Sequence, residues 1–320
     1  MRRETFLAFS LCFLAILCAS AAFEVPSPNE RQRALGDLQH EPAALRNLLA
    51  LTDDFLPVTP PQRTDWLSTH PEKGQTFDEY LNSHANRPDY SRHVIYLLPI
   101  GEFPEELCPP LESLRAYAAA FFQMEVKILP SYYPHDLEFT PRNNPHSRQR
   151  QVLTGSILDF LKLRLPPDAY CLLGVTMTDL YPQRSWNFVF GQASISDRVG
   201  VYSFARYNTT EPGTDPTNHI RELFFQRSTK VLVHETAHMF GLLHCIYFDC
   251  VVNGSNGLDE TDAQPQFLCP ICLRKLHHAI GFDPVLRYEQ LAKFYHREKW
   301  YSDFDWVQRQ LKKSTPASNP

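Results

Sequence analysis

Hydrophobic positions follow two different patterns through the middle of the chain, short continuous runs and helical spacing. Residues 92–101 (RHVIYLLPIG), 125–130 (EVKILP) and 170–181 (YCLLGVTMTDLY) are short apolar runs, which predicts buried strands. Apolar residues recur at helical spacing over 109–124 and 149–165, which predicts helices between those strands. Strands that alternate with helices predict an α/β sheet.

The next part of the chain predicts an edge of that sheet and then a long helix. Residues 186–207 contain two aromatic-rich segments around Asp197, which predicts a hairpin or an irregular strand pair at the sheet's edge. Residues 209–218 are turn-forming throughout. A helical pattern resumes at Arg221 and continues into HETAHMFGLLHC, residues 234–245.

The flanks of this region have a different composition. Residues 22–91 are rich in Pro, Asn, Arg, Asp and Glu, with short helical patterns at 41–52 and 76–83, so we expect a loosely built, partly helical extension. Beyond the last cysteine, residues 285–299 and 302–313 predict further helices. A mostly helical C-terminal part is therefore expected.

The first residues follow the pattern of a secretory signal peptide. Arg2 and Arg3 precede an apolar run over residues 6–18, and small residues follow it at 19–21. The run is shorter than the ~20 residues that a membrane helix needs. We expect cleavage before Ala22, entry into the secretory pathway, and no membrane span afterwards; an uncleaved anchor is the alternative.

Composition narrows the class of protein. The 320 residues are 43% hydrophobic and 12% aromatic, which is typical of a globular protein with a large core. The formal net charge of −5 gives no reason to expect nucleic acid as a partner.

The spacing within HETAHMFGLLH predicts a catalytic zinc site. His234 and His238 are four residues apart, so a helix presents both imidazoles on one face, and Glu235 lies near enough to reach a water held by the same ion. Gly241 can take a positive φ and end the helix, so that His244 turns back to the metal. Three imidazoles leave a fourth position for water, whose pKa zinc lowers to about 7.

A chance cluster is the alternative interpretation of this motif. A histidine on an apolar helix is usually a core residue, and H-E-x-x-H alone is a weak signal. The extended pattern H-E-x-x-H-x-x-G-x-x-H fixes five positions, each for its own physical reason, and it is the pattern of the metzincin zinc proteases. The zinc interpretation is therefore favoured.

Four of the eight cysteines form a second cluster. Cys245 directly follows His244, Cys250 comes five positions later, and Cys269 and Cys272 lie in a CPIC sequence. Four thiolates close a tetrahedral structural zinc site, which would fix the chain just after His244. Disulfides or a redox pair are the alternatives. A disulfide between Cys108 and Cys171, or two unpaired thiols there, is left open.

This combination of HETAHMFGLLHC, Cys250 and CPIC resembles the archaemetzincins, which are zinc metallopeptidases. The similarity extends over residues 92–283. It implies a metzincin-like mixed twisted sheet, an active-site zinc helix and a mostly helical C-terminal subdomain. It also implies two zinc ions, one catalytic and one structural. The residues assigned by the resemblance are Glu235 as base, His234, His238 and His244 at the catalytic zinc, and Cys245, Cys250, Cys269 and Cys272 at the structural zinc. An edge strand over residues 188–194 is expected to pair with extended substrate.

Two features depart from the family pattern. The family usually has a methionine two residues after the second cysteine, and this chain has Val252, so packing beneath the metal is in question. The family resemblance suggests a cytoplasmic or nuclear location, which is the alternative to secretion. The sequons at Asn208 and Asn253 fit a secretory route, but such sequences often arise by chance.

The hypothesis from sequence is a zinc-dependent metallopeptidase acting on peptides or proteins, with zinc-activated water and Glu235 as general base. A catalytically weak, zinc-stabilised binding protein is the alternative, and the retained Glu235 argues against it. The expected parts are a signal peptide, an N-terminal extension, a metallopeptidase domain, and a C-terminal helix with a tail, at residues 1–21, 22–91, 92–300 and 301–320.

Overall fold

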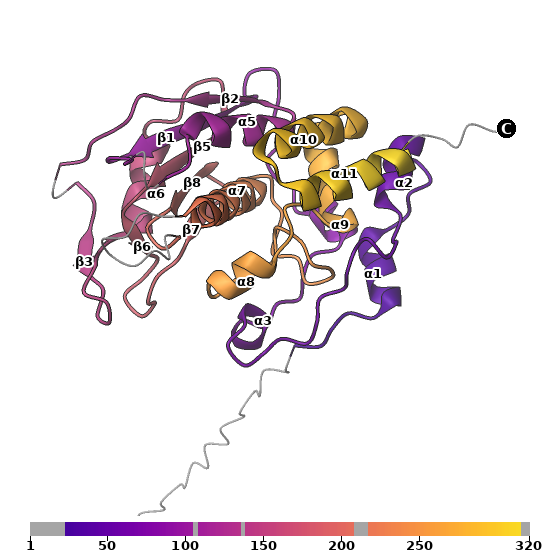
Figure 1. The fold of residues 1–320 in the computed structure, drawn as a ribbon, viewed down its shortest axis with the longest axis horizontal. Helices are drawn as coiled ribbons and strands as arrows, with labels where there is room; N and C mark the ends of the chain where they lie inside the picture. The colour runs from indigo at the N-terminus through magenta and orange to yellow at the C-terminus, as the bar shows by residue number, and fades with distance from the viewer. Residues whose placement is uncertain (1–22, 105–107, 136–137, 208–216, 315–320) are drawn as a thin grey trace, which may run out of the picture.

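The computed structural model describes residues 23–104, 108–135, 138–207 and 217–314 (Figure 1). The predicted signal peptide, the sequon at Asn208 and most of the predicted loop 209–218 lie outside the described residues.

A five-stranded mixed sheet forms one side of the molecule. Its order is β2-β1-β5-β8-β7; β1, β2, β5 and β8 are parallel, and β7 runs antiparallel to β8 at the edge. The strands are β1 (Val94–Ile100), β2 (Glu125–Ile128), β5 (Ala169–Thr176), β7 (Gly191–Ser194) and β8 (Val199–Ser203). β1, β5 and β8 are buried throughout, as expected for strands covered on both faces.

A smaller sheet of three strands lies beside it. Its strands are β3 (Pro141–Asn143), β4 (Arg150–Leu153) and β6 (Asp179–Tyr181), with β4 in the centre. The Gln151 amide donates to the Asp179 carboxylate at 2.8 Å, and Arg206 forms an ion pair with the same carboxylate. These contacts hold β6, from which the chain continues to the edge strand β7 of the large sheet.

Helices cover both faces of the large sheet. α5 (Leu111–Phe122) and α7 (Asn218–Met239) pack on one face, and α6 (Thr154–Lys162) packs on the other. Side chains alternate accordingly: Leu97 and Leu173 belong to the core beneath α5 and α7, whereas Leu98 and Leu172 belong to the core beneath α6. α7 is therefore buried along most of its length.

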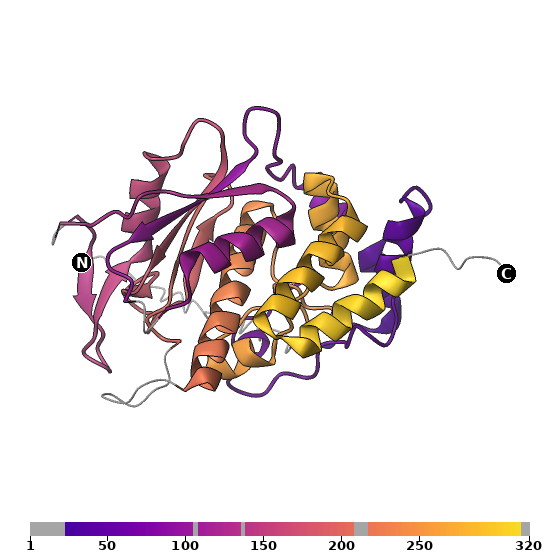
Figure 2. The ribbon, with the colours of Figure 1, turned by 45° about the horizontal axis from the view of Figure 1, so that its top comes forward.

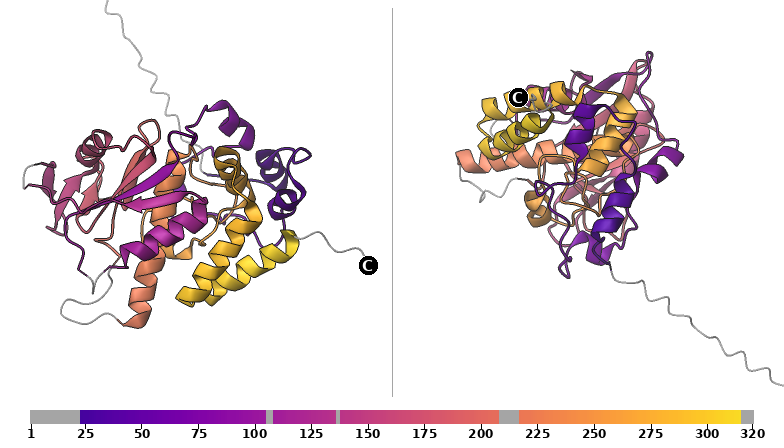
Figure 3. Two further views of the ribbon diagram at one scale, coloured as in Figure 1. Left: turned by 90° about the horizontal axis from the view of Figure 1, so that it is seen from above. Right: turned by 90° about the vertical axis from the view of Figure 1, so that its right-hand side faces the viewer.

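The helices of the two chain ends pack together on the far side of α7, as Figures 2 and 3 show. α10 contacts α5 and α11, α11 contacts α2, and α9 contacts α1, α2 and α4. The C-terminal helices are α9 (Pro270–Ile280), α10 (Pro284–Glu298) and α11 (Tyr301–Ser314), and the N-terminal ones are α1 (Pro28–Leu35), α2 (Ala43–Leu49) and α4 (Phe77–Asn82). Two short helices, α3 (Trp66–Thr69) and α8 (Leu258–Ala263), complete the described elements. No helix among the described residues is both long and apolar enough to cross a bilayer.

The structure confirms the mixed α/β class, the long helix through the zinc motif and the hairpin at the sheet's edge. Three predicted elements differ in their bounds. The edge strand expected over 188–194 covers only Gly191–Ser194. The predicted helix over 149–165 begins as strand β4, because Gln151 and Val152 pair with β6. The predicted strand over 170–181 is two strands in different sheets, β5 and β6, separated by a bend at which the Thr178 amide donates to the Thr176 hydroxyl.

Residues 23–91 contain four short helices, and their apolar side chains enter the main core, so the expectation of a loosely built extension is wrong. Leu35, Leu48 and Phe55 are buried in the same cluster as the residues of α7. This extension therefore lies against the rest of the molecule along its length, which matters for the site described below.

Candidate metal centres and active-site cleft

The end of α7 positions the first two histidines of the motif. The helix continues to Met239, and Gly241 follows with a φ of 82°, a conformation that favours glycine. The Gly241 amide donates to the His238 carbonyl at 2.8 Å, so the chain turns sharply and leads His244 back toward the helix. A Cβ at Gly241 would lie 2.3 Å from the Cβ of Ala85, so glycine is also required by close packing.

Each of the three imidazoles is held through its Nδ1 atom. His234 Nδ1 lies 3.0 Å from the Val251 carbonyl, and His238 Nδ1 lies 2.7 Å from the Leu242 carbonyl. His244 Nδ1 lies 2.8 Å from the Glu72 carboxylate. Oxygens of these kinds accept hydrogen bonds, so each Nδ1 carries the proton and each Nε2 is left with its lone pair.

Ligand nitrogens of the three histidines lie close together. The Nε2 atoms of His234 and His238 are 3.0 Å apart, although neither has a proton to place between them. Ligand atoms of all three histidines lie within 4.8 Å of one another. Tetrahedral zinc with ~2.1 Å bonds to nitrogen would separate its ligands by ~3.4 Å. The arrangement therefore fits a cation between the rings.

Burial keeps His234 and His238 in the state that binds metal. Desolvation lowers the pKa of His238 to about 4 and that of His234 well below its usual value. Both rings are therefore neutral at pH 7, and neutral imidazole is the form that coordinates zinc.

Glu235 lies on α7 with its carboxylate in the cleft, against the edge strand. Its side chain contacts β7 so closely that a Cβ at Gly191 would lie 2.5 Å from Glu235 Oε1. The residue is only 6% exposed, and burial raises the pKa of its carboxyl to about 8. A raised pKa near neutrality suits a group that must take up and release a proton.

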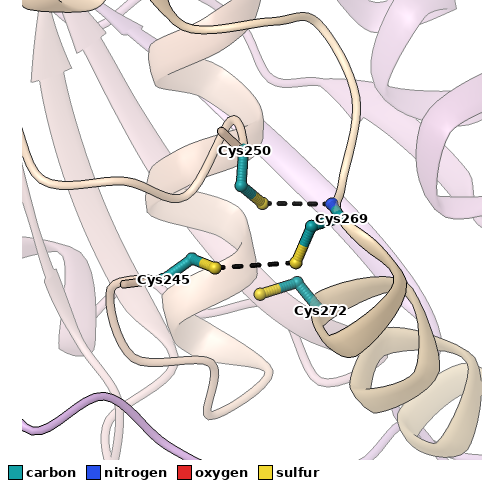
Figure 4. A group of neighbouring side chains, drawn as sticks. All are labelled: Cys245, Cys250, Cys269 and Cys272. Atoms are coloured by element: carbon teal, nitrogen blue, oxygen red, sulfur yellow. Dashed lines mark hydrogen bonds between the residues drawn. The ribbon is translucent and has the colours of Figure 1, made fainter. Parts of the chain in front are cut away.

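The four predicted cysteines come together behind the third histidine (Figure 4). All four are buried, and none forms a disulfide. The sulfurs of Cys245 and Cys269 are 3.5 Å apart, far beyond the ~2.05 Å of a disulfide and close to the ~3.8 Å expected between thiolates on one tetrahedral zinc. Cys269 caps α9 and Cys272 lies in its first turn, where the helix N-terminus stabilises thiolate charge. The cluster fits a closed, four-sulfur metal site.

Asn253 braces the loop that carries the first two cysteines. Its amide nitrogen donates to the Cys245 carbonyl at 2.7 Å and to the Phe248 carbonyl at 3.0 Å, and its amide oxygen accepts from the Cys250 backbone amide at 2.7 Å. A glycan would replace one of the two hydrogens on this nitrogen, so at least one of the first two bonds would be lost. The geometry therefore disfavours the sequon at Asn253 as a glycosylation site.

Val252, which departs from the family pattern, is fully buried in the main core. Its carbonyl accepts from the Cys245 amide at 2.9 Å, and the neighbouring Val251 carbonyl accepts from His234. The turn beneath the histidines is thus held by backbone bonds that do not depend on the side chain at residue 252.

Cys108 and Cys171 are not joined. Cys171 is fully buried in β5, and burial raises the pKa of its thiol. The Cys108 thiol donates to the Pro104 carbonyl at 2.9 Å. The disulfide that the sequence left open is therefore absent from the described residues.

A cleft of about 1080 Å³ contains the histidines and Glu235. One wall is the chain from Ser185 to Ala193, which leads into the edge strand β7, and a second wall includes Trp66 of α3 and the segment that follows it. Trp66, His70, Glu72, Lys73 and Gly74 supply that second wall, none of which the sequence predicted. They lie in a polar, Pro-containing stretch far from the motif, and no local pattern distinguishes them.

Glu72, in this wall, is bonded to the third histidine of the predicted metal site. Burial alone would raise the pKa of its carboxyl, but the contact with His244 outweighs burial and holds that pKa below its usual value. Glu72 therefore carries a negative charge next to the third histidine at pH 7.

Comparison with known proteins places these residues in a family context. The family model described as peptidase family M54 matches residues 168–278, which include every site residue predicted from the sequence. Archaemetzincin-2 of Mus musculus is 40% identical over 270 residues, covering 75% of this chain and 74% of that protein. Archaemetzincin-2 of Homo sapiens is 36% identical over 270 residues, covering 76% and 75%. The crystal structure of an archaemetzincin from Methanopyrus kandleri is 27% identical, covers 60% of this chain and 97% of that chain, and has a TM-score of 0.48.

Proposed function

Since the chain belongs to the archaemetzincin family of zinc metallopeptidases, we propose that it hydrolyses peptide bonds with zinc held by His234, His238 and His244 and with Glu235 as general base. The observation that carries this proposal is that ligand nitrogens of the three histidines lie within 4.8 Å of one another in a cleft that Glu235 also lines. Zinc bound there would polarise the substrate carbonyl and lower the pKa of a water molecule.

Glu235 would move the proton in this reaction. Its carboxylate takes the proton from the attacking water and returns it to the amine that leaves when the peptide bond breaks. Burial supports this role, because a desolvated carboxylate is a stronger base than one in water. The positive charge of bound zinc would lower the pKa of Glu235 and keep it ionised before the reaction.

The second ion in this proposal is a structural zinc at Cys245, Cys250, Cys269 and Cys272. Four sulfur ligands leave no coordination position for a substrate, so this ion would hold the loop after His244 and take no part in the chemistry. We therefore propose two zinc ions per chain, with different roles.

The substrate would be an extended peptide paired with β7. This strand is the edge of the large sheet, and Gly191 at its start contacts Glu235. An antiparallel peptide on the free side of β7 would lead its backbone past the Glu235 carboxylate. Side chains of the peptide would then face the cleft walls.

The test is cleavage of a peptide library, read by mass spectrometry, with the zinc content of each sample measured in parallel. The wild-type protein is compared with Glu235→Gln, which keeps the shape of the side chain and removes the base. We expect two zinc ions in both proteins and cleavage by the wild type alone. Equal cleavage by the two proteins would show that Glu235 is not the base.

A zinc-stabilised binding protein remains the second candidate. It predicts two zinc ions and peptide binding at the β7 edge, with no cleavage by either protein. We also propose, from residues 1–21 alone, that the chain enters the secretory pathway. Sequencing the N-terminus of protein recovered from culture medium tests this, and a mature chain that begins at Ala22 is the expected result.

A further inference from the structure

The third predicted zinc ligand is held by a residue from the N-terminal part of the chain. Glu72 Oε1 lies 2.8 Å from His244 Nδ1, and the two side chains are 27% and 19% exposed. A carboxylate bonded to Nδ1 fixes the orientation of the ring and increases the electron density at Nε2, the atom that faces the site. Glu72 lies outside residues 168–278, the part of the chain that the family model matches.

Glu72 is itself held in place by Trp66. The Trp66 indole donates to Glu72 Oε1 at 3.0 Å, and its ring meets the His244 ring edge-on with centroids 5.1 Å apart. The Trp66 backbone amide donates to the Glu260 carboxylate of α8 at 2.9 Å. One indole thus contacts both the carboxylate and the imidazole that the carboxylate orients.

The residues that follow Glu72 are hydrogen-bonded to the chain between His238 and His244. The Gln75 side chain donates to the Gly241 carbonyl at 3.2 Å and accepts from the Leu243 amide at 3.3 Å. The Tyr80 hydroxyl donates to the Phe240 carbonyl at 2.9 Å. We call residues 64–80 the clamp segment, because their bonds to residues 240–244 follow the backbone between the second and third histidines.

Glu72 would also place a negative charge near the metal. Among the described residues that line the cleft, the acidic ones are Glu72 and Glu235, and Lys73 and Lys230 line it as well. A carboxylate bonded to a ligand histidine would partly offset the charge of a zinc ion held by three imidazoles.

We propose that Glu72 is a positioning residue for the catalytic zinc, acting through His244, and that the clamp segment is a permanent wall of the active site. This inference rests on the proposed zinc ion at the three histidines. It implies that the N-terminal part of the chain contributes to metal affinity, and that its release would weaken the site rather than uncover it.

The test measures zinc affinity at the histidine site in the full chain, without reference to peptide cleavage. A chromophoric chelator competes for zinc, and the ion at the four cysteines serves as the internal reference. The variants are Glu72→Ala, Glu72→Gln, which keeps a hydrogen-bond acceptor without the charge, and Trp66→Phe, which keeps an aromatic ring without the indole donor. Asp78→Ala, an exposed acidic residue of the same segment, is the matched control.

We expect Glu72→Ala to weaken zinc binding at the histidine site by ~10–100-fold, with a smaller loss in Glu72→Gln and Trp66→Phe and none in Asp78→Ala. Cobalt(II) placed in the same site reports its geometry, so we also expect the d–d absorption of Glu72→Ala to change. A purely structural role would lower the thermal stability of the zinc-free protein and leave this spectrum unchanged.

Two results would overturn the proposal, and they are distinguishable. If the wild type binds zinc at both sites and Glu72→Ala retains its affinity within twofold, Glu72 has no positioning role and the proposed peptidase function stands. If the wild type binds zinc only at the cysteines, the proposed function fails as well. Should Glu72→Ala not fold, Glu72→Gln and Trp66→Phe give the same comparison with smaller perturbations.

Discussion

Substitution of Gly191 by alanine tests whether the position of Glu235 matters for catalysis. The new Cβ would lie 2.5 Å from Glu235 Oε1, 2.7 Å from its Cδ and 2.8 Å from its Cγ. Carbon atoms in contact are normally ~3.5–4.0 Å apart, so the end of the glutamate side chain must move by about 1 Å. No positive φ is required at Gly191, so the alanine backbone itself is not strained.

The expected effect is large on the rate and small on stability. A misplacement of ~1 Å at a catalytic group can cost about 10²-fold in rate, which corresponds to ~2.7 kcal/mol in the activation barrier. The free energy of unfolding should change by no more than ~1–2 kcal/mol, because a flexible side chain can yield to the added methyl group. Zinc content should not change, since the three atoms nearest to the added Cβ all belong to Glu235 and none to a histidine.

Gly200→Ala is the matched control, because Gly200 lies on the neighbouring strand and is also partly enclosed by side chains. Its added Cβ would meet Ala193 Cβ and Met239 Cε at 3.6 Å, which is an ordinary contact distance. The assay compares kcat and KM of both variants on a peptide selected from the library. A kcat for Gly191→Ala within threefold of the wild type, with Glu235 displaced in its crystal structure, would refute the reasoning.

Three further predictions concern stability, metal content and modification. Asn253→Ala should lower the free energy of unfolding by ~2–3 kcal/mol, because three hydrogen bonds are lost, and glycopeptide mapping of protein made in secreting cells should find Asn253 unmodified. Cys272→Ser should reduce zinc from two ions to one per chain and lower Tm by ~5–10 °C, whereas His238→Ala should lose one ion with little change in Tm; equal changes in Tm would contradict the division into structural and catalytic sites. Burial raises the pKa of Asp303 to about 6, so as the pH falls this carboxyl is protonated in the folded state before it is protonated in the unfolded state. Its contribution to the free energy of unfolding of the wild type therefore increases as the pH falls from about 6 to 4. Asp303→Asn should therefore stabilise the protein by ~1–2 kcal/mol at pH 7 and not at pH 4, as denaturant unfolding at the two pH values would show.

The histidine and cysteine clusters could be predicted because their geometry is mostly local. His234 and His238 depend only on helical periodicity, and Gly241 gives the turn that returns His244. Cys269 and Cys272 lie at the start of one helix, so their separation is fixed by that helix. Spacing along the chain was therefore enough to place these groups near one another.

Other features depend on partners that are distant in the sequence. Residues 170–181 form one apolar run, and only the pairing of Asp179 with Gln151 in the smaller sheet shows where the strand divides. Glu72 is 172 positions from His244, in a polar stretch that resembles a solvated loop until the fold brings the two side chains together. Neither feature has a local signal, because in both cases the tertiary contact determines the structure.

The three histidines are held by three different parts of the molecule, and this arrangement gives a reason for the two proposed metal sites to adjoin. Val251 follows Cys250 directly, and its carbonyl orients His234. Cys245 follows His244 directly, so one cysteine of the first pair adjoins a predicted zinc ligand and the other adjoins the carbonyl that orients one. A metal ion held by the four sulfurs would therefore limit the motion of two histidines at once. The helix-ending turn at Gly241 holds His238, and the clamp segment holds His244 from the opposite side through Glu72. Rigid placement of ligands is what a metal site of fixed geometry needs, and here it comes from the helix end, the cysteine loop and the N-terminal part of the chain acting together.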